Sequence, residues 1–163
     1  MKRRGEVPVG LGRVAVVGAD RTIAVHGLGS CVAVVLHDPD ACVGGVVHVV
    51  LPSTALARDR SNPARFAETA VPHLIGEMER EGGVHERLTA RLVGGARMFA
   101  ALMAPGVEHI GERNAVACRL ALDEANVPVI GEALGGERGR SLRFDVGAGT
   151  LLVWSVGNTP REL

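Results

Sequence analysis

The first third of the chain alternates short apolar runs with turn-forming residues. Runs rich in valine and isoleucine cover 13–17, 22–26, 31–37 and 43–51, and glycine, aspartate or proline bounds them. Residues of this type suit a pleated, half-buried surface. The pattern therefore predicts a sheet that begins with four consecutive strands.

A helical period replaces this alternation after residue 64. Apolar positions from Phe66 to Met78 recur at the three- and four-residue spacing of an amphipathic helix, which ends at Gly82-Gly83. Pro72 lies inside the run and is expected to remove one backbone hydrogen bond. A second apolar stripe predicts another helix from Asn114, its N-cap, to about Asn126.

Further strands are predicted over 87–95, 127–134, 141–146 and 150–156, and Gly-Ala-Gly is a hairpin signal between the last two. The first of these ends in a diglycine that either makes a turn or lines the floor of a site. The sequence contains no internal repeat, low-complexity segment or long polar linker, so a single domain is expected over 1–163. Long strand runs with two separated helices favour a sandwich. The fold class is an α/β or α+β sandwich, in which two main helices flank a mainly β core.

The amino-acid composition limits which binding partners and which cellular location are expected. Eighteen basic and eighteen acidic side chains cancel, so nucleic acid is not an expected partner. Three cysteines without C-x-x-C spacing indicate reduced thiols in a cytoplasmic protein. No apolar run approaches the roughly 18 to 20 residues that span a bilayer, so no membrane insertion is expected.

The candidate chemistry lies in two adjacent predicted strands. If Leu36 pairs with Val43 around the turn formers Asp38-Pro39-Asp40, Cys31 lies directly opposite His48. Opposed residues have Cβ atoms roughly 4.5–5.5 Å apart, close enough for a thiol to meet an imidazole. The pair then has the parts of a cysteine hydrolase, a nucleophile and a general base.

The residues before the thiol predict a substrate site. Gly27 and Gly29 leave space for a substrate near the backbone, and the N–H groups of Ser30 and Cys31 are placed to hold a developing oxyanion. The glycines do not form a dinucleotide motif, because Val32 occupies the position of the last required glycine and a strand follows.

Simpler interpretations stay open at this point. A free cysteine is usually buried packing, and a lone histidine among valines is usually structural. The six histidines show no H-x-x-x-H spacing, so neither a metal nor another cofactor is expected. Arg138 and Arg140 are expected in a solvated loop, or as a basic contact to acidic helices of a partner.

The segment GLGSCVAVVLHDPDACVGGVVHVVLP closely resembles the core of the CheD family of bacterial chemoreceptor glutamine deamidases. Later blocks resemble the same family in the same order: RFAETAVPHLI, LVGGARMF, IGERN and GGERGRS. The resemblance implies hydrolysis of glutamine side chains in the cytoplasmic helices of chemoreceptors, giving glutamate and ammonia. It also implies an α/β sandwich similar to the catalytic domain of deamidating cytotoxic necrotizing toxins, with no metal or organic cofactor.

Carried over residue by residue, the resemblance makes Cys31 the nucleophile and His48 the general base of a thioester mechanism. The family has a threonine six residues before the cysteine, and here Val25 stands at that position. Valine cannot hydrogen-bond an imidazole. Thr22, His26 or a backbone carbonyl are the alternatives for orienting His48.

The resemblance also offers a second class of function. Some CheD-like proteins bind a CheC-type phosphatase that acts on the response regulator, so the chain is alternatively a binding module for receptors or for such a phosphatase. The substitution Cys31→Ala separates the two functions, because it should abolish ammonia release and leave partner binding intact.

Overall fold

Two five-stranded sheets form the body of the protein, whose computed structural model describes residues 5–163. The first sheet contains, in spatial order, β1 (Glu6–Pro8), β3 (Thr22–Leu28), β8 (Arg140–Asp145), β9 (Thr150–Trp154) and β10 (Arg161–Glu162). The second contains β2 (Val14–Gly18), β5 (Val43–Val49), β4 (Val32–Asp38), β6 (Thr89–Gly94) and β7 (Val129–Leu134). Neighbouring strands are antiparallel except in the pairs β1–β3 and β6–β7.

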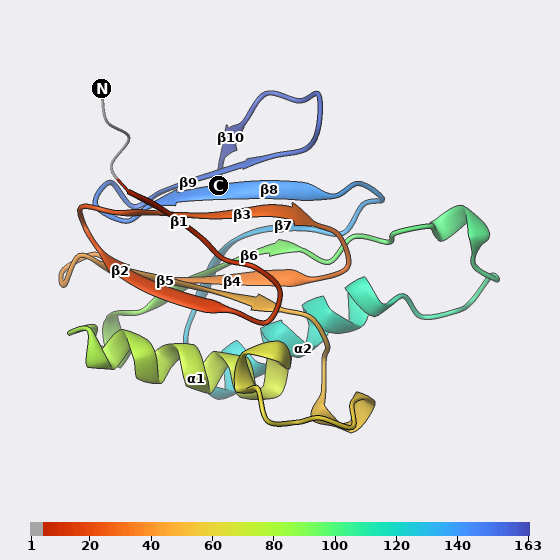
Figure 1. Cartoon of the computed structure of the whole chain (residues 1–163), viewed down its shortest axis with the longest axis horizontal. Coiled ribbons are helices and arrows are strands. Elements are labelled where there is room, and N and C mark those ends of the chain that lie inside the picture. Colours follow the sequence, from red (N-terminus) through yellow and green to blue (C-terminus); the bar gives the residue numbers. More distant parts are fainter. Residues whose placement is uncertain (1–4) are drawn as a thin grey trace.

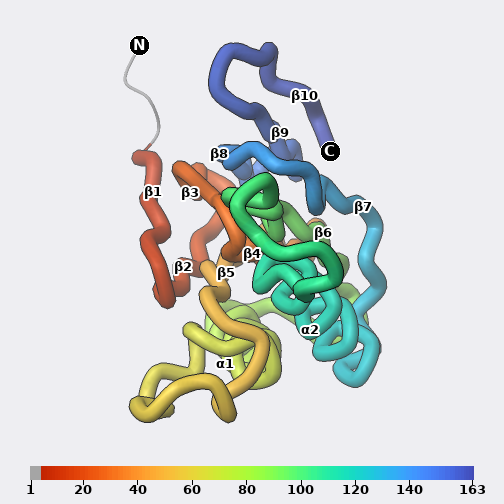
Figure 2. The backbone as a smooth tube through the Cα atoms, turned by 90° about the vertical axis from the view of Figure 1, so that its right-hand side faces the viewer, coloured from red at the N-terminus to blue at the C-terminus, as the bar shows by residue number. Residues whose placement is uncertain are grey.

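Both α-helices cover the outer face of the second sheet, so the layers follow the order sheet, sheet, helices (Figures 1 and 2). They are α1 (Ala67–Arg80) and α2 (Ile110–Glu124), and α2 makes the crossover that the parallel pair β6–β7 requires. Short 3-10 turns lie at Thr54–Leu56, Pro63–Arg65, His85–Arg87 and Ala100–Leu102. The fold is thus mixed α/β and mainly β, as the sequence predicts.

Two hydrophobic cores explain the composition of the central strands. In β4 and β5, Val34 and Val47 pack toward the helices, while Val35 and Val46 pack toward the first sheet. A strand covered on both faces is a nearly continuous apolar run. This is why 31–37 and 43–51 contain so little polar side-chain chemistry, and why His48 stands out.

The predicted elements are largely confirmed. The four N-terminal runs form β2 to β5, and the later runs form β6 to β9. Helix α1 contains Pro72 in its interior and buries the predicted apolar stripe. Asn114 as an N-cap is wrong, because α2 begins four residues earlier, at Ile110, and Asn114 lies fully buried within the helix.

The predicted register between β4 and β5 is also wrong. Leu36 pairs with Gly45, two residues from the predicted partner, and His48 lies opposite Ala33. Side chains alternate between the faces of a sheet with a period of two, so a shift of two residues leaves each side chain on the same face. Cys31 therefore remains on the face of His48, as a diagonal rather than a direct neighbour.

The turn after β4 explains the shift. The carboxylate of Asp38 accepts hydrogen bonds from the N–H groups of Asp40 and Ala41, both at 3.1 Å. Cys42 completes the turn with a left-handed φ of 52°. An aspartate that binds the backbone beyond it favours a tight turn. The strands consequently pair as far as Asp38 and Val43.

Candidate active site

Cys31 lies immediately before β4, in the connection from β3. It is half-buried, and its side chain packs against the core between the two sheets. Burial raises the pKa of the thiol, and its own main-chain N–H opposes that effect. A thiol that stays protonated near neutral pH needs a base to become a nucleophile.

His48 is a buried, neutral imidazole with one ring nitrogen unoccupied among residues 5–163, the form that a general base requires. The side chain is 4 % exposed, and its Nδ1 lies 3.2 Å from the carbonyl oxygen of Val9. Because a carbonyl only accepts, Nδ1 is assigned the proton and Nε2 keeps its lone pair. Nε2 is buried and has no hydrogen-bond partner in the described part of the chain. Burial lowers the pKa of His48 and the bond to Val9 opposes this, so the ring is neutral at neutral pH.

The two side chains share one end of the second sheet. Continuing the β4–β5 register places Cys31 opposite Val50, two residues beyond His48. Diagonal neighbours of this kind lie about 7 Å apart, and no hydrogen bond joins the pair within residues 5–163. Catalytic hydrogen bonds are often long in a free enzyme and tighten around substrate. The arrangement is compatible with a dyad that closes on its substrate.

The alternatives for orienting His48 separate clearly in the structure. Val25 is fully buried in β3, Thr22 begins that strand three residues away, and the His26 side chain is exposed. The imidazole is held instead by the main-chain carbonyl of Val9, whose own N–H donates to Ala24 at 2.9 Å. The residue type of Val9 carries no signal for this contact, because the contact uses only the backbone.

The turn that carries Cys31 has all three carbonyls of Gly29–Cys31 bound. In chain order they accept from the N–H of Ala96 at 2.9 Å, Nδ2 of Asn114 at 2.9 Å and the N–H of Gly95 at 2.8 Å. In the described part of the chain, the N–H groups of Gly29 and Ser30 donate to no acceptor, and the N–H of Cys31 interacts only with its own sulfur. Amide N–H groups that lack an acceptor in another residue, next to a thiol, are available to stabilise an oxyanion.

Gly27 differs from the other residues of the turn. It has a φ of 69°, which favours glycine, and its N–H donates to Oγ of Ser141 at 3.2 Å. The diglycine at the end of β6 lies against Cys31, since a Cβ on Gly94 would stand 2.2 Å from the carbonyl oxygen of Cys31. The diglycine therefore adjoins the turn that carries Cys31, and both of its residues have a positive φ.

The expectation that Arg140 lies in a solvated loop is wrong. Its guanidinium is half-buried and donates to the carbonyls of Gly94, Ala133 and Gly135. A planar guanidinium has five N–H donors, which suits it to bind several carbonyls at once. Arg140 therefore holds the end of β6 and the end of β7 together, beside the turn that carries Cys31. Arg138, in contrast, lines an open cleft.

This cleft, of about 450 Å³, begins beside Gly27. Its walls combine apolar side chains with charged ones, and its lining residues are Gly27, Met98, Glu137, Arg138, Gly139, Arg140, Ser141, Trp154 and Val156. Met98 also lies over Gly29, where a Cβ would stand 3.1 Å from its Cγ. The cleft thus adjoins the turn that precedes the thiol.

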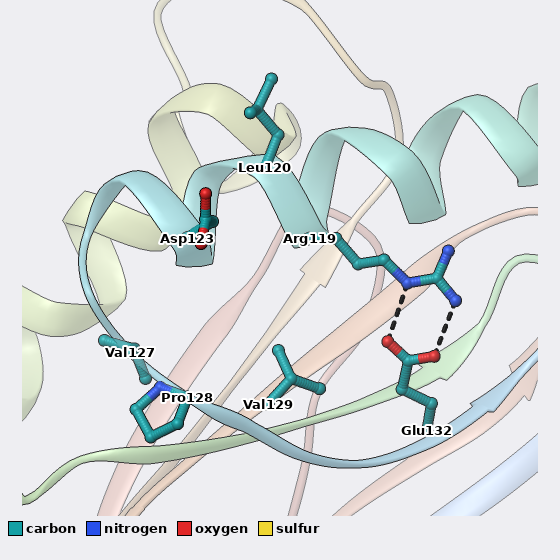
Figure 3. Close-up of a pocket in the computed structure, with 7 residues that line it drawn as sticks. All are labelled: Arg119, Leu120, Asp123, Val127, Pro128, Val129 and Glu132. Carbon is teal, nitrogen blue, oxygen red and sulfur yellow. Dashed lines mark hydrogen bonds and ion pairs between the residues drawn. The ribbon is translucent and has the colours of Figure 1, made fainter.

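A second groove, of about 550 Å³, lies between α2 and β7 (Figure 3). Arg119 and Glu132 bridge it with two hydrogen bonds of 2.7 and 2.6 Å. None of its lining residues belongs to the predicted site. Among residues 5–163, no three His, Cys, Asp or Glu side chains are grouped to hold a metal ion, and no helix is long and apolar enough to cross a membrane.

Comparison with known proteins places the chain in a family. Residues 50–155 match the family model described as CheD chemotactic sensory transduction. This chain belongs to the CheD family. A Desulforamulus reducens protein named probable chemoreceptor glutamine deamidase CheD is 39% identical over 157 residues, covering 96% of this chain and 95% of that protein.

Two further relatives carry the same name. The Caldanaerobacter subterraneus subsp. tengcongensis protein is 39% identical and the Clostridium kluyveri protein 35% identical. The alignments cover 92% and 97% of this chain, and 93% and 98% of those proteins. The CheD resemblance expected from the sequence motifs is confirmed. The match to the family model begins at residue 50, so Cys31 and His48 lie outside that match.

Proposed function

We propose that this CheD-family protein is a chemoreceptor glutamine deamidase, which converts glutamine side chains to glutamate and releases ammonia. One arrangement carries the proposal: a half-buried thiol beside three amide N–H groups that have no acceptor in another described residue, with a neutral imidazole on the same sheet face. The substrate class comes from the names of the relatives. The cytoplasmic helices of the receptors are the proposed partner, and the cytoplasm is the proposed location.

In the first half of the reaction, Sγ of Cys31 attacks the carboxamide carbon while Nε2 of His48 takes the thiol proton. The amide oxygen becomes an oxyanion held by the N–H groups of Gly29–Cys31. When this intermediate collapses, the carbon–nitrogen bond breaks. The imidazolium gives its proton to the departing ammonia, and a thioester to Cys31 remains.

In the second half, water attacks the thioester and His48 accepts a proton from it. The carbon–sulfur bond breaks, and the Cys31 thiolate recovers that proton from the imidazolium. The net change is amide plus water to carboxylic acid plus ammonia, so no oxidant or cofactor enters. The carbonyl of Val9 stabilises the ring in both protonation states, because it accepts from Nδ1 in each.

A protein substrate suits the surface around the site. The loop from β6 to α2 projects near the β3–β4 connection (Figure 1), and it exposes Phe99, Leu102 and Val107 at 74%, 84% and 45%. Exposed apolar side chains grouped on one loop are compatible with a macromolecular contact. We propose that a receptor helix lies along this loop and presents its glutamine beside the cleft at Gly27. A CheC-type phosphatase, the partner in the alternative binding-module function, would use the same exposed loop.

The test is incubation with a recombinant cytoplasmic receptor fragment. We expect one ammonia for each glutamine that gains the mass difference between an amide and an acid. Cys31→Ala should reduce both signals to background and retain fragment binding. Cys118→Ala, which removes a fully buried thiol from α2, is the control for loss of a cysteine. A wild-type protein that binds the fragment without changing its mass would support the binding module instead.

We further propose that the fold is shared with the catalytic domain of deamidating cytotoxic necrotizing toxins. The support is the arrangement of two packed sheets with a cysteine at a strand start and a histidine in the neighbouring strand. Superposition of the two folds, with the cysteine and histidine overlaid, tests this directly.

A further inference from the structure

Asn114 lies outside the proposed dyad, yet it contacts both segments that carry it. The side chain is fully buried in α2, and its Nδ2 donates to the carbonyl of Ser30 at 2.9 Å and to that of Val50 at 3.0 Å. Both partners are carbonyls, which only accept, so the orientation of the amide is fixed. A buried polar group that reaches two distant backbone segments ties those segments together.

The bond to Ser30 determines which way the next peptide N–H points. The peptide between Ser30 and Cys31 is trans, and a planar trans peptide directs its C=O and N–H in opposite directions. With the Ser30 oxygen turned toward α2, the Cys31 N–H points away from the helix layer. The Cys31 side chain packs on that other side, against the core between the sheets.

A second observation agrees with this orientation. The Cys31 N–H lies close enough to its own sulfur to lower the pKa of the thiol, against the larger effect of burial. The N–H therefore faces the nucleophile. An oxyanion formed by attack of that sulfur would develop beside the same N–H, which is the geometry that stabilises it.

The bond to Val50 involves the other half of the dyad. Val50 follows β5, two residues after His48, and the register of β4 and β5 places it opposite Cys31. A single amide thus holds the residue before the nucleophile and the segment that carries the base. Helix α2 is fixed close to them, because a Cβ on Gly111 would lie 2.3 Å from the carbonyl oxygen of Ala96.

We propose that Asn114 is a positioning residue, which holds the Ser30–Cys31 peptide so that the Cys31 N–H faces the oxyanion. The inference deepens the proposed deamidation and rests on it. Asn114 touches no reacting atom. It acts through the peptide, so its removal should impair reactions that pass through an oxyanion more than reactions of the thiol that do not.

The experiment compares two reactions of Cys31 in a Cys42→Gly background, because Cys42 is exposed and would also be alkylated. Alkylation by iodoacetamide, followed against pH, displaces iodide and forms no oxyanion. Deamidation of the receptor fragment does form one. Asn114→Ala is the main variant, and Asn114→Ser retains one hydroxyl donor. Cys118→Ala is the matched control, a truncation of a buried residue one turn further along α2.

For Asn114→Ala we expect kcat for deamidation to fall by about 100-fold or more with KM unchanged, the loss typical of an oxyanion-hole donor. The apparent pKa of Cys31 from alkylation should rise, because the thiolate loses its N–H partner. The alkylation rate at the high-pH plateau should stay within about twofold of the background protein. Asn114→Ser should fall between the two, and Cys118→Ala should match the background in all three measurements.

Two results would overturn the proposal. One is a plateau alkylation rate that falls as far as kcat, which would mean that Asn114 only maintains the general structure. The other is an unchanged pKa of Cys31 with unchanged kcat. If the background protein does not deamidate, the proposed function fails, and the pKa of Cys31 in Asn114→Ala against Cys118→Ala still decides the positioning. If Asn114→Ala does not fold, Asn114→Ser provides the same comparison.

Discussion

Gly94→Ala should inactivate the enzyme by displacing the nucleophile rather than by removing a functional group. Gly94 has a φ of 120°, and a Cβ there would lie 2.2 Å from the carbonyl oxygen of Cys31. An ordinary carbon–oxygen contact is about 3.3 Å, so the two atoms must separate by about 1 Å. A displacement of that size at a reacting group costs about 100-fold in rate.

The same substitution should also lower the free energy of unfolding, by an amount that can be estimated from the structure. The backbone conformation costs about 1–3 kcal/mol for a residue with a side chain. Loss of the hydrogen bond from Gly95 to Cys31 adds about 1 kcal/mol, giving about 2–4 kcal/mol in all. Because domains of this kind have about 5–15 kcal/mol of stability, the variant should remain folded at 25 °C.

The assay is kcat for deamidation together with urea unfolding. Gly82→Ala is the matched control, since Gly82 follows α1 with a φ of 94° and has no atom within 4 Å of an added Cβ. The control should lose about 1–3 kcal/mol of stability and keep its kcat. If Gly94→Ala retained kcat within about threefold of Gly82→Ala, the diglycine would not position Cys31, and the reasoning would be refuted.

Three further predictions concern charge and the orientation of the base. Burial alone would raise the pKa of Asp38, but hydrogen bonds from Arg87 and from backbone N–H groups lower it to about 2. The ionised Asp38 therefore stabilises the fold fully at pH values above its pKa in the unfolded chain, about 3.9, and this stabilisation is lost as pH falls through about 2. Asp38→Asn should flatten the dependence of the urea unfolding midpoint on acid pH. Burial lowers the pKa of His48, so the acid limb of kcat/KM should have its midpoint below about 6.5, and a midpoint above about 7 would contradict this assignment. Because the Val9 carbonyl already orients His48, Val25→Thr should change kcat by less than about threefold, and a tenfold increase would show that the carbonyl is insufficient.

Local sequence patterns predict most helices and strands of this chain, because buried positions recur at regular intervals along each of them. The helix stripe that includes Ala70, Leu74 and Met78 is buried as expected, with Pro72 inside α1. The apolar runs of β4 and β5 reflect burial on both faces. In each case the prediction of the element depends only on residues a few positions apart in the sequence.

Such patterns predict neither the register between β4 and β5 nor the group that orients His48. The turn at Asp38 shifts the β4–β5 pairing by two residues, because its side chain binds backbone N–H groups that the residue types do not specify. The predicted dyad retains its common face only because an even shift preserves side-chain parity. Val9 acts through its carbonyl, and Asn114 acts on segments 84 and 64 residues away. A single sequence contains no local signal for either contact.

These contacts join residues that are far apart in the sequence, so the proposed active site is completed late in folding. A nascent chain with only β4 and β5 already places Cys31 and His48 on one hairpin, but it lacks the α2 amide and the donors after β6. The bond from Gly27 to Ser141 spans 114 residues, so its partner is synthesised long after Gly27. Contacts so distant in sequence form late, because their loop-closure entropy must first be overcome. The proposed site, with its contacts from α2 and from the residues after β6, is therefore complete only when the whole tertiary structure has formed.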